Sequence, residues 1–307
     1  MIPTIRGTAA TTASVLLAGG LVACSSGDTG STGSTGDDAP EVLATFTILA
    51  DMAQEVAGDA LEVSSLTRPG AEIHGYDPTP GDIRTAAGAE VILSNGLGLE
   101  NWVDKLTADS DATRVTVTEG IDPVPIDGTD EPNPHAWMSP VLATVYVDNI
   151  VEALSDFQPA DADTFRDNAE AYKRQLDEVQ NDLTEGLSHL PESQRALQTC
   201  EGAFSYLTRD AGLAESYIWP VNSDAEITPD QIRTAASFVD DNDVPAVFCE
   251  STVDPGPKEQ LIRDTGARDG GTLYVDSLTE AGGDAPTYLD LIRYDVDTIV
   301  AGMRGDS

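Results

Sequence analysis

The chain has 307 residues, which is too long for one small core and suits two lobes of ordinary domain size. Hydrophobic residues make up 40% of it, so a sizeable core can be buried and disorder throughout the chain is excluded. Aspartate and glutamate number 54 against 16 lysines and arginines, and the resulting net charge of -38 repels phosphate backbones and argues against nucleic-acid binding.

The N-terminus has the pattern of an export signal. Arg6 precedes a small, apolar run at 13–23, which is too short to span a bilayer comfortably and is typical of a signal-peptide core. The run ends in the residues LVAC, which resemble the bacterial lipobox and imply lipid attachment to Cys24 after cleavage of residues 1–23. The alternative is a plain secretory signal with an incidental cysteine.

The segment that begins at this cysteine is predicted to be a tether. Residues 24–40 are dominated by glycine, serine, threonine and aspartate, a composition typical of a disordered spacer. No later stretch of the sequence is apolar and long enough to span a membrane, so we expect the mature chain to be held at the outer face of the cell membrane through its lipid.

From residue 41 short β-like runs alternate with helical stretches. This βαβα order predicts a mostly parallel sheet covered by helices. Thr79 is the expected cap of one helix, with Pro80 in its first turn. The predicted strands lie at 42–47, 61–66 and 90–94, and the predicted helices lie at 49–57 and from residue 80 onward.

An unusually long helix is predicted for residues 161–189. Its apolar residues recur every three or four positions and so form one stripe of a helix. A helix of this length between two α/β halves is typical of a rigid connection, or spine helix, that joins two lobes. It predicts an N-terminal lobe at 41–157, a connecting helix at 158–190 and a C-terminal lobe at 191–307. The stripe consists of Phe165, Ala169, Tyr172, Leu176, Val179, Leu183 and Leu187.

The α/β alternation returns after Pro191, where the long helix ends. The sequence therefore predicts an α/β fold of two lobes with mostly parallel sheets flanked by helices, linked by one long helix. In the second lobe the predicted strands are 195–199, 246–248 and 272–275, and the predicted helices are 229–241, 257–265 and 288–303.

Two cysteines remain once Cys24 carries the lipid. Cys200 and Cys249 each follow an apolar stretch and each directly precede a glutamate. If the two stretches are neighbouring parallel strands, the thiols lie at the same end of the sheet. In an oxidising compartment this pattern predicts a disulfide, with two free buried thiols as the alternative.

The chain has three histidines, and two of them lie in loops next to predicted strands or helices. His74 and His135 could reach a cleft between the lobes, whereas His189 ends the spine helix, where a cation favours the helix dipole. Glu201 and Asp276 each follow a predicted strand, and in an open α/β sheet such residues point into the crevice at the strand ends. Two residues from each lobe could then converge on one ion.

The sequence resembles the solute-binding proteins of manganese, zinc and iron ABC importers from residue 42 to the last helix. Many ordered local motifs carry this resemblance. They are ATFTILAD at 44–51, PG at 69–70 with His74, YDPTP at 76–80, NGLGLE at 95–100, PHAW at 134–137, EGAF at 201–204, YIW at 217–219, TP at 228–229, VPA at 244–246, ES at 250–251 and VDP at 253–255.

The resemblance implies a specific metal site. The two histidine ligands of the family fall on His74 and His135, and its third and fourth ligands fall on Glu201 and Asp276. The resemblance also implies two α/β lobes joined by one rigid helix and an ABC permease as the partner. A rigid connecting helix in turn suggests a small motion of the lobes. We expect a monomer that captures the metal outside the cytoplasm and has no enzymatic activity.

The ligand set favours Mn(II), with Fe(II) possible. Carboxylates offer hard oxygen atoms and can bind a metal through one or both of them. They therefore suit higher coordination numbers than tetrahedral Zn(II) prefers. Members that resemble zinc proteins carry a histidine at the position of Glu201 and often a histidine-rich loop before the second ligand. Here the loop 120–134 is acidic and contains no histidine. Zn(II) remains the alternative, since it binds many nitrogen and oxygen sites tightly.

Other residues in the matching motifs suggest supporting roles. We expect Trp137 and Trp219 to pack near the cleft and Glu250 to be structural. Asp77 and Asn222 could orient the ligands through hydrogen bonds.

Two other classes of function compete with metal import. A metallo-hydrolase would need an open coordination position and a nearby base, and four protein ligands leave little room for a substrate. A surface adhesin is an activity attributed to some lipid-anchored members of the family, and the sequence neither supports nor refutes it.

Overall fold

A computed structural model describes residues 41–108, 110–221 and 227–305. The predicted signal peptide, Cys24, the tether and Asn222 lie outside these residues. Within the described ranges, no helix is both long and apolar enough to cross a membrane.

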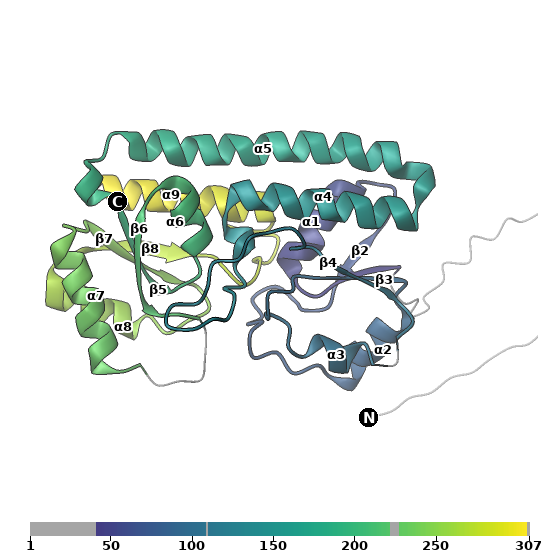
Figure 1. The fold of residues 1–307 in the computed structure, drawn as a ribbon, viewed down its shortest axis with the longest axis horizontal. Coiled ribbons are helices and arrows are strands. Elements are labelled where there is room, and N and C mark those ends of the chain that lie inside the picture. The colour runs from purple at the N-terminus through teal and green to yellow at the C-terminus, as the bar shows by residue number, and fades with distance from the viewer. Residues whose placement is uncertain (1–40, 109, 222–226, 306–307) are drawn as a thin grey trace, which may run out of the picture. The chain divides into compact units, whose positions relative to one another are not determined.

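The N-terminal half is built on a four-stranded parallel sheet with the order β2-β1-β3-β4. β1 and β3 are buried, as expected of central strands with helices on their faces. Figure 1 shows this sheet below helix α1. The strands are β1 (Val42–Ala44), β2 (Val63–Ser65), β3 (Val91–Ser94) and β4 (Thr113–Thr116), and the helices are α1 (Thr47–Ala57), α2 (Pro80–Gly88) and α3 (Val103–Leu106).

Local chemistry explains the start of α2, and α1 begins two residues earlier than predicted. Thr79 caps α2 through a reciprocal capping box with Asp82, and Pro80 occupies the first turn, as predicted. The predicted strand 42–47 ends earlier, at Ala44, because Thr47 already belongs to α1. A short run rich in β-branched residues cannot by itself distinguish a strand from a buried helix start.

The long helix α5 (Ala162–Ser188) lies within the predicted range 161–189. Its buried stripe contains all seven of the apolar residues expected there. Figure 1 shows α5 running past both halves, and it packs against α1, α4 (Pro140–Phe157) and α9 (Tyr288–Arg304). Helix α4 was not expected from the sequence, although Ser139 and Pro140 form a recognisable helix start.

The C-terminal half contains two pairs of parallel strands, β5–β6 and β7–β8. β5 and β7 lie side by side, and a disulfide joins Cys200 to Cys249 between them. The strands are β5 (Ala196–Glu201), β6 (Ala214–Trp219), β7 (Ala246–Glu250) and β8 (Arg268–Leu273), and the helices are α6 (Ser205–Ala211), α7 (Pro229–Asp241) and α8 (Gly256–Thr265).

The predicted strand 272–275 differs from the observed β8, which ends at Leu273. The backbone N–H of Tyr274 donates to the buried carboxylate of Asp295 at 2.9 Å, so it is not available to a sheet ladder. Asp276 therefore lies in a loop after the strand and not directly at the strand end.

One hydrophobic core extends through both halves. It includes residues of β1 and β3, the stripe of α5 and the buried face of α9. A smaller core lies among β5, β6, β7 and the helices α7 and α8. The predicted fold class is confirmed: parallel sheets are flanked by helices, with one long helix beside both halves. The residue boundaries of the two lobes stay a prediction.

Candidate metal centre

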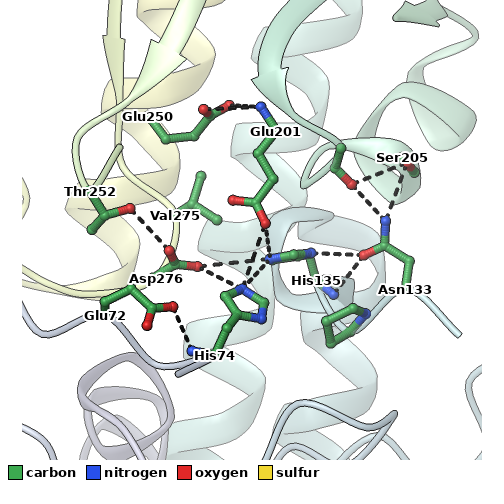
Figure 2. Close-up of polar contacts among 12 residues, drawn as sticks. Glu72, His74, Asn133, His135, Glu201, Ser205, Glu250, Thr252, Val275 and Asp276 are labelled. Carbon is green, nitrogen blue, oxygen red and sulfur yellow. Dashed lines mark hydrogen bonds and ion pairs between the residues drawn. The ribbon is translucent and has the colours of Figure 1, made fainter. Parts of the chain in front are cut away.

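Four side chains from distant parts of the chain converge between the two halves (Figure 2). His74 follows β2, and His135 precedes the short 3-10 helix Ala136–Met138. Glu201 is the last residue of β5, and Asp276 follows β8. Each offers one nitrogen or oxygen atom, and these atoms all lie within 4.8 Å of one another. The structure thus brings together all four residues that the sequence suggested as ligands.

The distances among these atoms suit a single ion. The two histidine Nε2 atoms are 3.1 Å apart. The carboxylate oxygens of Glu201 and Asp276 lie 3.5–3.8 Å from the histidine nitrogens. The centre of a regular tetrahedron with edges of this size is about 2.2 Å from each corner, which is close to a metal–nitrogen or metal–oxygen bond length.

Burial and charge prepare these groups for a cation. His135, Glu201 and Asp276 are buried, whereas the His74 side chain keeps 11% of its surface exposed. Burial, together with the neighbouring His74, lowers the pKa of His135 to about 3. Its imidazole is therefore neutral at physiological pH, and a neutral imidazole is the form that binds metal.

Asp276 is held in its charged form. Burial alone would raise the pKa of its carboxyl, but His74, His135 and the Thr252 hydroxyl, which donates to Oδ2 at 3.0 Å, lower it below the usual value. A carboxylate thus faces the two imidazoles. With Glu201, the site has the donor set that neutralises a doubly charged cation.

Each histidine has a hydrogen-bonded support. The backbone N–H of His74 donates to Glu72 Oε1 at 2.6 Å, which fixes the loop that carries the ring. Asn133 Oδ1 lies 2.8 Å from His135 Nδ1 and accepts from the His135 backbone N–H at 3.0 Å. Asn133 was not among the residues expected at the site from the sequence. An amide two residues before a candidate ligand was the available sign, and it is weak without coordinates.

Glu201 is supported by its own half of the molecule. Its backbone N–H lies 3.2 and 3.3 Å from the two oxygens of the Glu250 carboxylate, which accepts the hydrogen bond. Burial raises the pKa of Glu250 to about 8. The neighbouring residues Cys200 and Cys249 share a disulfide with an S–S distance of 2.01 Å, as the sequence predicted, so their sulfurs are not thiolate ligands.

The remaining candidates divide into packing and surface roles. Trp137 is buried, its ring centroid lies 5.1 Å from that of His135, and its Nε1 donates to the Val275 carbonyl at 3.0 Å. Trp219 is partly buried against the smaller core. The prediction that Asp77 orients a ligand is wrong, because its exposed carboxylate pairs with Lys105 at 3.0 Å.

A cavity of about 660 Å³ opens beside His74. Leu97, Pro134 and Pro220 contribute to its wall. His74, the one candidate ligand with an exposed edge, forms part of the wall of this cavity.

Known proteins resemble the chain over most of its length. The family described as zinc-uptake complex component A, periplasmic (ZnuA), matches residues 42–302. The iron-binding protein YfeA of Yersinia pestis is 47% identical over 86% of each chain. The manganese-binding lipoprotein MntA of Halalkalibacterium halodurans is 34% identical over 91% of this chain and 93% of its own.

A solved structure shares the fold. The manganese-bound periplasmic metal-binding protein of Candidatus Liberibacter asiaticus superposes with a TM-score of 0.80 at 36% identity. The match covers 85% of this chain and 98% of that protein. The chain therefore belongs to the ZnuA family, the extracytoplasmic substrate-binding proteins of metal ABC transporters, which bind solutes and are not enzymes.

Proposed function

We propose that this protein captures a divalent transition-metal ion with His74, His135, Glu201 and Asp276 and delivers it to the permease of an ABC importer. The observation that carries the proposal is the convergence of two imidazole nitrogens and two carboxylate oxygens within 4.8 Å in a buried site. Buried ionisable groups gathered this closely are costly unless a cation or ion pairs compensate them.

Mn(II) is the preferred cargo, with Fe(II) as the next candidate. A glutamate at position 201, where a third histidine would favour Zn(II), allows either carboxylate to bind through two oxygens and so to raise the coordination number. The iron- and manganese-binding relatives support this preference. The zinc-uptake description of the family makes Zn(II) the alternative cargo.

The protein is further proposed to be a monomer anchored through a lipid on Cys24. The residues LVAC at 21–24 and the polar segment after them support the anchor. The Halalkalibacterium relative bears the name lipoprotein, which agrees with this reading. A tether of this composition would leave the metal site free to meet a permease at the same membrane.

Metal-dependent thermal stability tests the proposal. We expect Mn(II), Fe(II) under anaerobic conditions and Zn(II) each to raise the melting temperature of chelator-stripped protein, since a ligand at 100 times its Kd stabilises the folded state by about 2.7 kcal/mol. A variant with His74→Ala and His135→Ala together should lose the shift. The matched control is His189→Ala, at the exposed end of α5, which should respond like the wild type.

Two outcomes would count against the proposal. If none of the three metals shifted the melting temperature of the stripped wild-type protein, metal capture would be refuted. Metal analysis of protein purified from its native host tests the preference separately, and a preparation containing zinc alone would replace manganese by zinc.

A further inference from the structure

The side chain of Asn133 lies beside His135, one of the proposed ligands (Figure 2). On one side its Oδ1 faces His135, 3.0 Å from the backbone N and 2.8 Å from Nδ1. On the other side its Nδ2 donates to the backbone carbonyl of Gly202, the residue after Glu201, at 2.6 Å. One amide therefore contacts both segments that carry these two proposed ligands, although Asn133 and Gly202 are 69 residues apart in the chain.

The orientation of this amide is determined by its neighbours. A backbone N–H can only donate, so the atom of Asn133 that faces the His135 backbone must be the oxygen. A backbone carbonyl can only accept, so the atom that faces Gly202 must be the NH₂ group. A flipped amide would place two donors together on one side and two acceptors together on the other.

The amide orientation in turn selects one tautomer of His135. Because Asn133 Oδ1 can only accept, Nδ1 of the imidazole must carry the hydrogen of the 2.8 Å contact. In the neutral ring the lone pair then resides on Nε2. Nε2 is the atom that lies 3.6 Å from Glu201 and 3.8 Å from Asp276.

We propose that Asn133 is a positioning residue for metal capture: it holds His135 in the Nδ1–H tautomer and ties that ligand to the strand end that carries Glu201. This inference rests on the proposed function, because it assumes that His135 Nε2 binds the ion. No contact between Asn133 and the ion is implied.

Asn133 and its partner Gly202 are themselves held in place. The Asn133 backbone N–H donates to the Val124 carbonyl at 2.7 Å. Gly202 donates to the Trp219 carbonyl at 3.0 Å, and a Cβ on Gly202 would lie 2.4 Å from the Pro220 carbonyl oxygen. Since neither end can shift freely, the amide has one geometry in which to act.

The first test is Asn133→Ala. Loss of a hydrogen-bond partner of a metal-binding histidine typically weakens metal affinity by about 10–100-fold, and we expect a loss of Mn(II) affinity in that range. Nitrogen NMR of labelled histidine in the metal-free protein should show His135 as the pure Nδ1–H tautomer in the wild type and as a tautomer mixture in the variant. With three histidines in the chain, loss of a signal in His135→Gln identifies the resonance.

Asn133→Asp separates the two tasks of the amide. Its carboxylate keeps an acceptor for His135 Nδ1 and loses the donor to Gly202, so we expect the Nδ1–H tautomer to persist while Mn(II) affinity falls less than in Asn133→Ala. The matched control is Tyr206→Phe, which removes a neighbouring hydrogen bond to the Asn133 backbone and leaves the amide–imidazole contact intact. It should keep both the tautomer and the affinity.

The inference is overturned if Asn133→Ala keeps a pure Nδ1–H tautomer, or if its Mn(II) affinity stays within twofold of the wild type. It is also overturned if Tyr206→Phe reproduces both effects, since general loosening of the loop would then explain them. The tautomer is measured without metal, so its result stands apart from the proposed function, which fails only if the wild type binds no metal.

Discussion

Glu201 and Asp276 both come from the C-terminal half of the chain, yet different parts of the molecule hold them. The residues on either side of Asp276 bond to the N-terminal half. The Val275 carbonyl accepts from Trp137 at 3.0 Å, and the Leu278 N–H donates to the Thr47 hydroxyl at 3.0 Å. Ser277 adds a third link, because its hydroxyl accepts from the Gly70 N–H at 2.8 Å.

Glu201 has a different environment. It ends β5, its backbone donates to Glu250, and the disulfide next to it fastens β5 to β7. Asn133 reaches this strand end from the N-terminal half through Gly202. The sequence places two candidate ligands in each half, but the segment around Asp276 is held mainly by the N-terminal half, whereas Glu201 is held mainly by its own half. A ligand's position in the chain therefore does not tell which part of the fold supports it.

Removing either carboxylate should produce the largest effect. If a four-ligand site binds with on the order of 16 kcal/mol, each ligand contributes about 4 kcal/mol, or roughly a 1000-fold change in affinity. We expect such a loss of Mn(II) affinity from both Asp276→Ala and Glu201→Ala, measured by competition with a metal-binding dye. A variant that binds within tenfold of the wild type would show that its residue is not a ligand.

The support of Glu201 alone can be weakened by replacing Cys200 and Cys249 together with serine. The cysteines are 49 residues apart, and closing a loop of this length in the unfolded chain is worth about 4 kcal/mol. We expect the free energy of unfolding in guanidinium chloride to fall by roughly 3–4 kcal/mol. A loss of less than about 1 kcal/mol would mean that the bridge adds little to the hydrogen bonds at this strand end.

Asp51 offers a pH-dependent test of how the halves are joined. Its Oδ2 accepts from the Tyr288 N–H of α9 at 2.8 Å, and burial raises its pKa from 3.8 to about 6. The protonated form thus stabilises the fold fully below about pH 4, and this contribution is lost as the pH rises through 6.

Asp51→Asn should remove this dependence, since the amide is neutral and still accepts a hydrogen bond. We expect the free energy of unfolding of the variant to exceed that of the wild type by up to about 3 kcal/mol at pH 8 and by almost nothing at pH 4. Chemical denaturation across this pH range measures the difference. The exposed Asp59→Asn, which removes a carboxylate elsewhere on the same half, serves as the control. An equal gain from Asp51→Asn at both pH values would contradict the prediction.

The smallest expected effect concerns the support of Asp276. Ser277→Ala removes the hydroxyl that contacts Gly70 and Thr47, which should lower the free energy of unfolding by about 1 kcal/mol. Mn(II) affinity should fall only a few-fold, since the Trp137 and Thr47 links to the flanking residues remain. Ser188→Ala, at the exposed end of α5, is the matched control. A loss as large as that of Asp276→Ala would show that Ser277 alone fixes the ligand.

The elements that could be predicted from sequence are those defined by local patterns. The stripe of α5 repeats every three or four residues without a break, and the capped start of α2 is encoded in four adjacent residues. The early end of β8 could not be predicted, because the partner of the Tyr274 N–H is Asp295, which lies on α9.

The candidate site was likewise only partly predictable from local sequence patterns. The resemblance to a family named the four proposed ligands, and the structure brings them together. Asn133 and the links around Asp276 remained hidden, because each depends on a contact between segments about 70 to 230 residues apart in the chain. Asp77 was misassigned for the converse reason: its motif matches the family, but its side chain points to the surface.

The close contact between α5 and α9 has a mechanical consequence. α5 and α9 come so close at Gly186 that a Cβ there would lie 2.7 Å from the side chain of Val300, and Arg304 donates to the Gly186 carbonyl at 2.9 Å. Sliding one helix along the other would require Val300 to move away from Gly186 and Arg304 to break its hydrogen bond to the Gly186 carbonyl. A force applied to either half therefore travels along the helix pair as along a single rod and is not absorbed by slippage.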